Sequence, residues 1–185
     1  MAAWADVAIV SAWLMVLGQN FVLIARGVRQ AAEPLRWTAG LALAIGLVVA
    51  GVTLERASGG RLVAPGVLTV VGVGLALTGA ALHVRARAVL GAAWSSNVAP
   101  APTLVERGPY AVVRHPLYAA LALIGLGTVV AHPSLPTLAG ALGLALGLAL
   151  KIAREEESLA HALGARWGAY RARVPCLVPR VFGRR

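Results

Sequence analysis

The chain reads LYAALALIGLGTVVA over residues 117–131, then HPSLPT, then LAGALGLALGLAL over residues 138–150. Neither apolar run contains a charged residue, and the short segment between them holds two prolines. At ~1.5 Å of rise per helical residue, each run with its flanking residues covers roughly 24–27 Å. We therefore predict a helical hairpin over residues 116–154 that crosses a bilayer and returns, so that its two ends meet at one membrane face.

Polar residues stand at both ends of this hairpin. The sequence RHPLY occupies residues 114–118, where the hairpin begins, and REE occupies residues 154–156, where it ends. If the hairpin forms, these two clusters are brought to the same side of the membrane. A basic pocket with an imidazole and carboxylates at the membrane edge is then a candidate binding site.

The composition indicates an all-α integral membrane protein. Hydrophobic residues make up 59% of the chain and charged residues only 13%, whereas a soluble domain has to spread charge over its surface. We predict five spans in one membrane domain, residues 1–185, with three N-terminal spans before residue 85 and the hairpin region after it. The predicted spans are residues 7–25, 37–54, 62–84, 117–131 and 138–151. The last two are short for ~30 Å of hydrocarbon, and a re-entrant hairpin would reduce the number to four.

The distribution of Lys and Arg predicts the orientation. Of 17 such residues, Arg56 and Arg61 are the two that fall on one face. The positive-inside rule therefore puts the N-terminus outside and the C-terminus in the cytoplasm. The Ala-, Gly- and Arg-rich composition suggests a prokaryotic source, so we expect the cytoplasmic (inner) membrane of a prokaryote. The first six residues carry an acid and no base, so we expect the first span to be retained and not cleaved as a signal peptide. The net charge of +10 suits attraction to anionic lipid, and no soluble basic domain is present to bind nucleic acid.

The glycines, the loop, the tail and the single cysteine each support a more local prediction. Gly72, Gly74 and Gly79 suit close packing of the third span. Residues 88–113 are rich in turn-forming residues and predict an irregular cytoplasmic loop. The spacing of apolar residues after Glu157 predicts an amphipathic helix at the cytoplasmic surface, broken by Gly164 and finished by Pro175. The single Cys176 excludes an internal disulfide, and its surroundings lack metal-ligand spacing, so no metal is expected.

The residue types at the hairpin ends suit a zwitterionic ligand that carries hydroxyl groups. Pro116 is suited to the first turn of a helix, where free N–H groups and the helix dipole favour an anion. Arg114 adds a bidentate donor beside His115. Glu155 and Glu156 leave the second helix at its negative end, where carboxylates are unfavourable without a cationic or hydroxylic partner.

Each of these residues also has a plainer explanation. Arg114 could serve only to set the membrane orientation and His115 only to cap a helix. The glutamates could form a solvated face paired with Lys151 and Arg154. We favour a site because the hairpin puts both clusters on one face.

The sequence GPYAVVRHPLY over residues 108–118 resembles the signature of the isoprenylcysteine carboxyl methyltransferase family, here of bacterial or archaeal type. A second signature resembles Glu155-Glu156-x-x-Leu, then LGxxWxxY over residues 163–170 and Val-Pro over 174–175. LGxxWS over residues 90–95 is similar to bacterial members. The resemblance covers roughly residues 85–180. Ala120 replaces the usual Gly, and Leu163 and Trp167 replace the usual Phe and Tyr.

The resemblance implies an activity. These proteins, like the related phospholipid methyltransferases, are integral-membrane enzymes that use S-adenosylmethionine and release S-adenosylhomocysteine. The acceptor is expected to be an amphiphilic small molecule or lipid that reaches the site from the bilayer at the cytoplasmic interface. The family name points to a prenylated cysteine carboxylate, which we do not transfer to this chain.

The resemblance also implies roles for individual residues. The carboxylate of S-adenosylmethionine would meet Arg114, His115 and the helix start at Pro116. Its amino group or ribose hydroxyls would meet Glu155 or Glu156, and the two glutamates could exchange these roles. The further cofactor-binding residues would be Tyr110, Tyr118, Trp94 and Asn97. Of all these residues, Arg114 and Glu155 are expected to be catalytic.

Two other functions stay open at this stage. Membrane sterol and steroid reductases share a loosely similar motif and use NADPH, but they usually have Asn where this chain has Leu117. A non-enzymatic scaffold or transporter subunit would explain the spans without a role for His115. The acceptor, the atom that is methylated and the oligomeric state are not encoded in any pattern we recognise.

Overall fold

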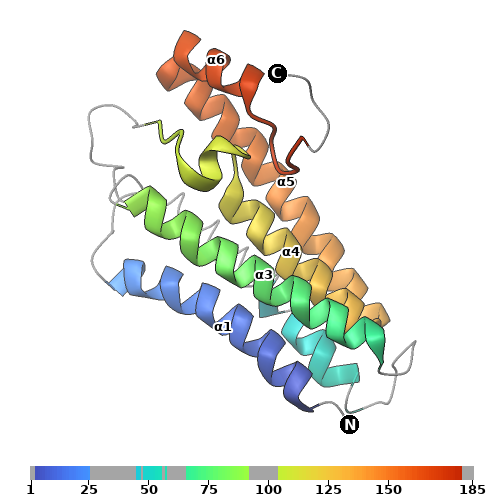
Figure 1. Ribbon diagram of the computed structural model, residues 1–185. Coiled ribbons are helices and arrows are strands. Elements are labelled where there is room, and N and C mark those ends of the chain that lie inside the picture. The colour runs from blue at the N-terminus through green and yellow to red at the C-terminus, as the bar shows by residue number, and fades with distance from the viewer. Residues whose placement is uncertain are drawn as a thin grey trace.

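A computed structural model describes residues 3–25, 45–46, 48–55, 57, 66–91 and 104–180. These residues form helices, turns and irregular segments and contain no strand, which agrees with the predicted all-α class. The helices are α1 (Ala3–Ala25), α3 (Val67–Leu90), the short 3-10 helix η2 (Gly108–Ala111), α4 (Pro116–Ala131), α5 (Leu135–Leu163) and α6 (Ala165–Arg173) (Figure 1). Residues 48–55 are also helical.

The apolar helices are consistent with a membrane location. Within the described ranges, α3 and α5 are long and apolar enough to cross a bilayer, while Trp4–Gln19 and Pro116–Ala131 are shorter apolar helices. The predicted third span, residues 62–84, becomes a helix that starts at Val67 and continues to Leu90. Much of the predicted second span lies outside the described residues. The prediction of five spans therefore stays a prediction.

The predicted hairpin is formed by α4 and α5, and local sequence signals explain its turn. Pro116 opens α4, as its missing N–H allows. Ser134 begins α5 with a capping box: its hydroxyl accepts from the Thr137 N–H, and the Thr137 hydroxyl accepts from the Ser134 N–H at 3.1 Å. These paired bonds satisfy N–H groups that would otherwise lie exposed at the helix start.

The predicted tail helix after Glu157 is confirmed in its break at Gly164 and in its end before Pro175, but its first residues are the end of α5 and not the start of a new helix. No glycine or proline interrupts the chain between Lys151 and Leu163, so α5 continues without a break from the apolar segment to Leu163. Gly164, with a φ of 52°, ends it and α6 follows. Because Glu155 and Glu156 lie on this continuous helix, their positions are fixed relative to the hairpin.

Glycines let α3 pack closely on α4. A Cβ added to Gly72 would lie 2.5 Å from the Gly127 carbonyl oxygen, and one added to Gly79 would lie 2.7 Å from the Ala120 carbonyl oxygen. The packing prediction is confirmed for these two glycines. It is wrong for Gly74, where an added Cβ would meet nothing within 4 Å.

A buried polar cluster joins three helical segments at the end of α4. His132 Nε2 lies 3.0 Å from Asp6 Oδ1 of α1, and His132 Nδ1 lies 3.5 Å from Glu55 Oε2. All three side chains are buried. One helix length, roughly 24 Å for 16 residues, separates this cluster from the start of α4 at Pro116.

We expect Asp6→Asn to lower the free energy of unfolding in detergent by about 2 kcal/mol, because the carboxylate that lies 3.0 Å from buried His132 becomes neutral. Ligand affinity at the far end of α4 should stay unchanged. Titration with sodium dodecyl sulfate in mixed micelles, followed by circular dichroism, measures the change, with exposed Glu157→Gln as control. An equal effect of the two substitutions would contradict a structural role for the cluster.

Candidate functional site

The structure brings the two ends of the hairpin into contact. Arg114 donates from Nε at 2.9 Å and from Nη2 at 2.7 Å to Oε1 of Glu156. His115 Nε2 lies 3.1 Å from the same oxygen. The Arg114 and Glu156 side chains are only 9% and 12% exposed. We call this group of three side chains the clamp.

The chain after α6 folds back to hold the clamp from the other side. The Arg114 N–H donates to the Pro175 carbonyl at 2.8 Å and the His115 N–H donates to the Cys176 carbonyl at 3.1 Å. Arg114 Nη1 donates to the Val174 carbonyl at 2.6 Å and to the Arg171 carbonyl at 3.3 Å. The start of α4 is therefore fixed by the end of the chain as well as by α5.

The charge of Glu156 is favoured by its partners. Burial acts to raise the pKa of this carboxyl, but hydrogen bonds and charge from Arg114 and His115 outweigh burial and hold the pKa below its ordinary value. Glu156 lies past the apolar part of α5 and also approaches Arg171 at 3.6 Å. The clamp is thus an ion pair at neutral pH.

The anion receptor expected at the start of α4 is largely satisfied from within the protein. The Arg114 side chain donates four hydrogen bonds to protein oxygens: one from Nε, two from Nη1 and one from Nη2. The N–H groups of Tyr118 and Ala119 donate to the His115 carbonyl. In this arrangement Arg114 shapes the site more than it offers free donors to a ligand.

Glu155 faces a different environment from Glu156. The Tyr118 hydroxyl donates to its Oε2 at 2.6 Å, while the residue as a whole is exposed. The Tyr118 ring stacks on His115 at 5.6 Å between centroids, and Lys151 Nζ lies 6.0 Å from the Tyr118 ring centre. Glu155 therefore presents carboxylate oxygen at the surface of the cluster, beside an aromatic wall.

Tyr110 connects this cluster to α6. Its carbonyl accepts from the Tyr170 hydroxyl at 2.7 Å, and its ring is buried. Burial, together with the charge of Glu155 and the influence of Tyr170, raises the pKa of Tyr110, and nearby Arg87 offsets only part of this. Its hydroxyl therefore stays protonated and can donate. Trp94 and Asn97 lie outside the described residues.

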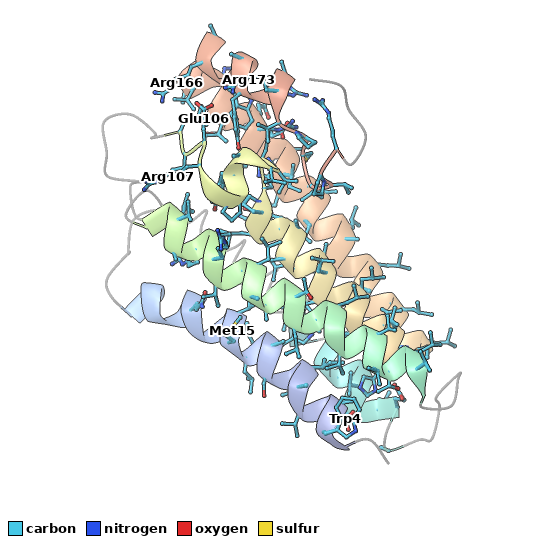
Figure 2. The ribbon with its side chains drawn as sticks, in the orientation of Figure 1. Trp4, Met15, Glu106, Arg107, Arg166 and Arg173 are labelled. Carbon is cyan, nitrogen blue, oxygen red and sulfur yellow. The ribbon has the colours of Figure 1, made fainter. Side chains whose placement is uncertain are left out.

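An ion pair and a buried cluster place α6 over the segment before η2. Arg173 Nη2 lies 2.7 Å from Glu106 Oε2, and Trp167 and Tyr170 pack with Leu104. Figure 2 shows Arg107, Arg166 and Arg173 at the α6 end of the molecule and Trp4 at the opposite end. Three basic side chains thus lie toward the end of the molecule that carries α6.

Sequence reasoning missed Cys176, which the structure puts beside the clamp. Its Sγ lies within 4.8 Å of ligand atoms of His115 and Glu156, a donor set that a metal could use. Burial, followed by the charge of Glu156, raises the pKa of the thiol, and the Arg114 guanidinium already occupies Glu156. The donor set therefore does not fit a cation. The sequence signal that could have placed Cys176 at the site is its position directly after the Val-Pro signature.

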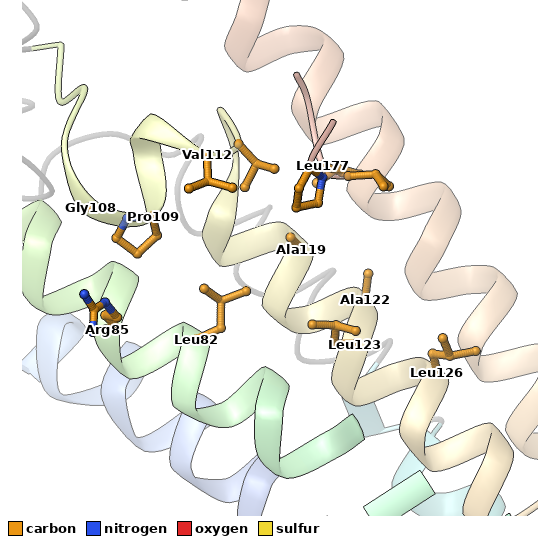
Figure 3. A pocket seen from close by; sticks show the side chains of 13 residues that line it. Leu82, Arg85, Gly108, Pro109, Val112, Ala119, Ala122, Leu123, Leu126 and Leu177 are labelled. Carbon is orange, nitrogen blue, oxygen red and sulfur yellow. The ribbon is translucent and has the colours of Figure 1, made fainter. Parts of the chain in front are cut away.

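An apolar groove of about 650 Å³ runs beside the start of α4 (Figure 3). α3, η2, α4 and residues 177–179 line it, and Arg85 is the one charged residue among its lining residues. Val113 and Ala119 belong to the lining and are sequence neighbours of Arg114 and Tyr118. The groove and the polar cluster thus share the start of α4.

The comparisons with known proteins agree with the sequence motifs. Residues 72–161 match the model of the isoprenylcysteine carboxyl methyltransferase family. The matched range runs from Gly72 of α3 through the whole of α4 to His161 of α5, and it includes both glutamates. A comparison with curated proteins gave no match.

Proposed function

Residues 72–161 of this chain belong to the isoprenylcysteine carboxyl methyltransferase family, and on that premise we propose that the protein is an S-adenosylmethionine-dependent methyltransferase of a membrane. The observation that carries the proposal is the contact between Arg114, His115 and Tyr118 and the two glutamates. These groups lie at one end of an apolar helical hairpin. That position suits a polar cofactor and an apolar acceptor in one site.

The geometry favours different roles for the two glutamates. Glu156 is committed to Arg114 and His115, so we assign it to holding the site together. Glu155 keeps carboxylate oxygen toward the surface, so we assign it to the amino group or ribose hydroxyls of the cofactor. Tyr118 fixes the Glu155 side chain by a 2.6 Å bond, which limits the rotamer entropy lost on binding.

The chemistry requires little from the protein beyond alignment. Glu155 would hold S-adenosylmethionine, which when bound would supply a methyl group on sulfonium sulfur for transfer to a lone pair of the acceptor, with S-adenosylhomocysteine as the leaving group. A carboxylate acceptor needs no base, since it has no proton to lose. The residues of this chain would hold the two reactants in line and exclude water.

The acceptor class follows from the surroundings of the site. An amphiphile could place its head near Glu155 and Tyr118 and its apolar part in the groove between α3 and α4. The labelled arginines at the α6 end (Figure 2) fit a cytoplasmic face for the site. We propose the cytoplasmic membrane as its location, with the N-terminus outside.

The proposal is tested by ligand binding to the purified chain in lipid nanodiscs. We expect S-adenosylhomocysteine to bind more tightly than NADPH in isothermal titration calorimetry. Glu155→Gln should weaken S-adenosylhomocysteine about tenfold, because one charge-assisted hydrogen bond is lost. Exposed Glu157→Gln on the same helix is the matched control and should bind as the wild type does.

Product formation is tested separately. Lipid extract and methyl-labelled S-adenosylmethionine, incubated with the protein, should give a labelled apolar product that mass spectrometry identifies. Tighter binding of NADPH would favour a reductase. Equal affinity of the wild type, Glu155→Gln and Arg114→Ala for S-adenosylhomocysteine would favour a scaffold.

A further inference from the structure

Two buried side chains, one on α3 and one on η2, carry polar atoms that lack a hydrogen-bond partner. They are His83 of α3, through Nδ1, and Tyr110 of η2, through its hydroxyl. Their exposed fractions are 5% and 8%. No described residue bonds to either atom. Because a buried polar atom without a partner costs free energy, their retention calls for a ligand that supplies the partner.

The two side chains belong to one region of the molecule. Tyr110 packs against Ala86 and Leu117, and α3 contacts η2. His83 lies one turn before Ala86 and Arg87 on the same helix. Arg87 is close enough to act electrostatically on both His83 and Tyr110. The last turns of α3 and the Tyr110 ring thus form a shared polar region.

This region joins the site already described. Tyr110 interacts electrostatically with Glu155 and with Arg87, and also with Tyr118. Tyr110 therefore interacts both with the glutamate expected to hold the cofactor and with the basic end of α3. A ligand that binds at Glu155 and Tyr110 would lie beside this end of α3.

The chemistry of this region suits an anion. Tyr110 offers a hydroxyl donor, Arg87 contributes a permanent positive charge, and the imidazole of His83 can donate from Nδ1. Arg114, the residue first expected to receive a carboxylate, directs four N–H bonds to protein oxygens. A carboxylate needs donors and positive charge in a dry setting, and the end of α3 offers both.

We propose that His83, Arg87 and Tyr110 form a carboxylate-binding site on the α3 side of the methyl-transfer site. The proposal rests on the proposed function, because it names the part of the ligand that this side receives. Two carboxylates could come to it: that of the methionine part of the cofactor, or that of an acceptor whose oxygen is methylated. No pattern in the sequence identified His83 or Arg87 for this role.

The test compares probes that differ only in the carboxylate. S-adenosylhomocysteine is compared with S-adenosyl-3-thiopropylamine, which lacks its carboxyl group, and palmitate is compared with hexadecanol. Binding is measured by calorimetry on the full chain in nanodiscs for the wild type, Tyr110→Phe and Arg87→Gln. Exposed Arg107→Gln, which removes one positive charge from the same region, is the control.

We expect Tyr110→Phe and Arg87→Gln to weaken one carboxylate probe about tenfold and to leave its carboxyl-free partner unchanged. A loss confined to S-adenosylhomocysteine assigns the site to the cofactor, and a loss confined to palmitate assigns it to the acceptor. Tyr110→Phe should unfold at the same or a higher temperature than the wild type, since it deletes an unsatisfied hydroxyl. A merely structural tyrosine would instead lose stability.

The inference and the proposed function fail in different ways. If the wild type binds S-adenosylhomocysteine but neither variant discriminates between the probes, the carboxylate site is wrong and the proposed function stands. If both variants lose carboxylate and carboxyl-free probes equally, the carboxylate site is also wrong. If the wild type does not bind S-adenosylhomocysteine, the proposed function fails, and the palmitate pair alone decides the carboxylate site.

Discussion

Glu156→Gln is expected to lower the free energy of unfolding by about 3 kcal/mol, because it leaves the buried Arg114 guanidinium without a charged partner. Glu155→Gln, one residue earlier on α5, should cost less than about 1 kcal/mol, since Glu155 is exposed and holds one hydroxyl. Unfolding by sodium dodecyl sulfate in mixed micelles, followed by circular dichroism, measures both. For S-adenosylhomocysteine affinity we expect the reverse order: relative to its loss of stability, Glu155→Gln should weaken binding more than Glu156→Gln does.

The pH dependence of this effect has a defined sign. The folded protein holds the pKa of Glu156 below its ordinary value of 4.5. The stabilisation of the folded protein by ionised Glu156 is therefore complete at pH values above the ordinary pKa, and it is lost as the pH falls through the lowered pKa. The difference in stability between wild type and Glu156→Gln should thus be constant at neutral pH and shrink in acid. A Glu155→Gln loss as large as that of Glu156→Gln would contradict the separate roles assigned here.

The distinction between the two glutamates illustrates what the sequence could not supply. The hairpin, the helix start at Pro116 and the pairing of the two polar clusters follow from hydropathy, proline chemistry and helix length. Neighbouring residues on a helix point about 100° apart, so only one of two adjacent glutamates can face Arg114. The direction in which α5 is rotated is set by packing along its whole length, and residue types at 155 and 156 are identical.

Rotation around a helix also explains the glycines of α3. Gly72 and Gly79 are seven residues apart and lie on nearly the same face, whereas Gly74 is turned away by about 200° from Gly72. Helical arithmetic could have separated them, but composition alone treats all three as packing residues. His83 falls on the same stripe as Gly72 and Gly79, four residues beyond Gly79. The face of α3 that carries Gly72 and Gly79 in the packed core therefore also carries His83 at the proposed carboxylate site.

The cluster of Asp6, Glu55 and His132 could not be predicted for a different reason. Its members are separated by long stretches of sequence, and each belongs to a different helical segment. A lone histidine after an apolar run gives no signal of its partners. Only the packing of α1 and residues 48–55 around the end of α4 brings the carboxylates to it.

Gly72→Ala is expected to destabilise the protein by about 3 kcal/mol or more, because the contact at this point is between backbones. The new methyl would meet the Gly127 carbonyl oxygen at 2.5 Å and the Ala131 methyl at 2.8 Å. Backbone cannot move aside as a flexible side chain does, so α3 and α4 would have to separate. Since α4 begins at Pro116 beside the clamp, S-adenosylhomocysteine affinity should fall together with stability.

Gly74→Ala is the matched control, two residues along the same helix. An added Cβ at Gly74 meets nothing within 4 Å, and alanine favours a helix by up to about 1 kcal/mol over glycine. The two substitutions insert the same methyl group into α3 and should therefore change the unfolding free energy in opposite directions. Equal unfolding midpoints for the two variants in mixed micelles would mean that α3 and α4 are not packed backbone to backbone. In that case packing of α3 on α4 would not be what holds Tyr118 and His115 in position against α5.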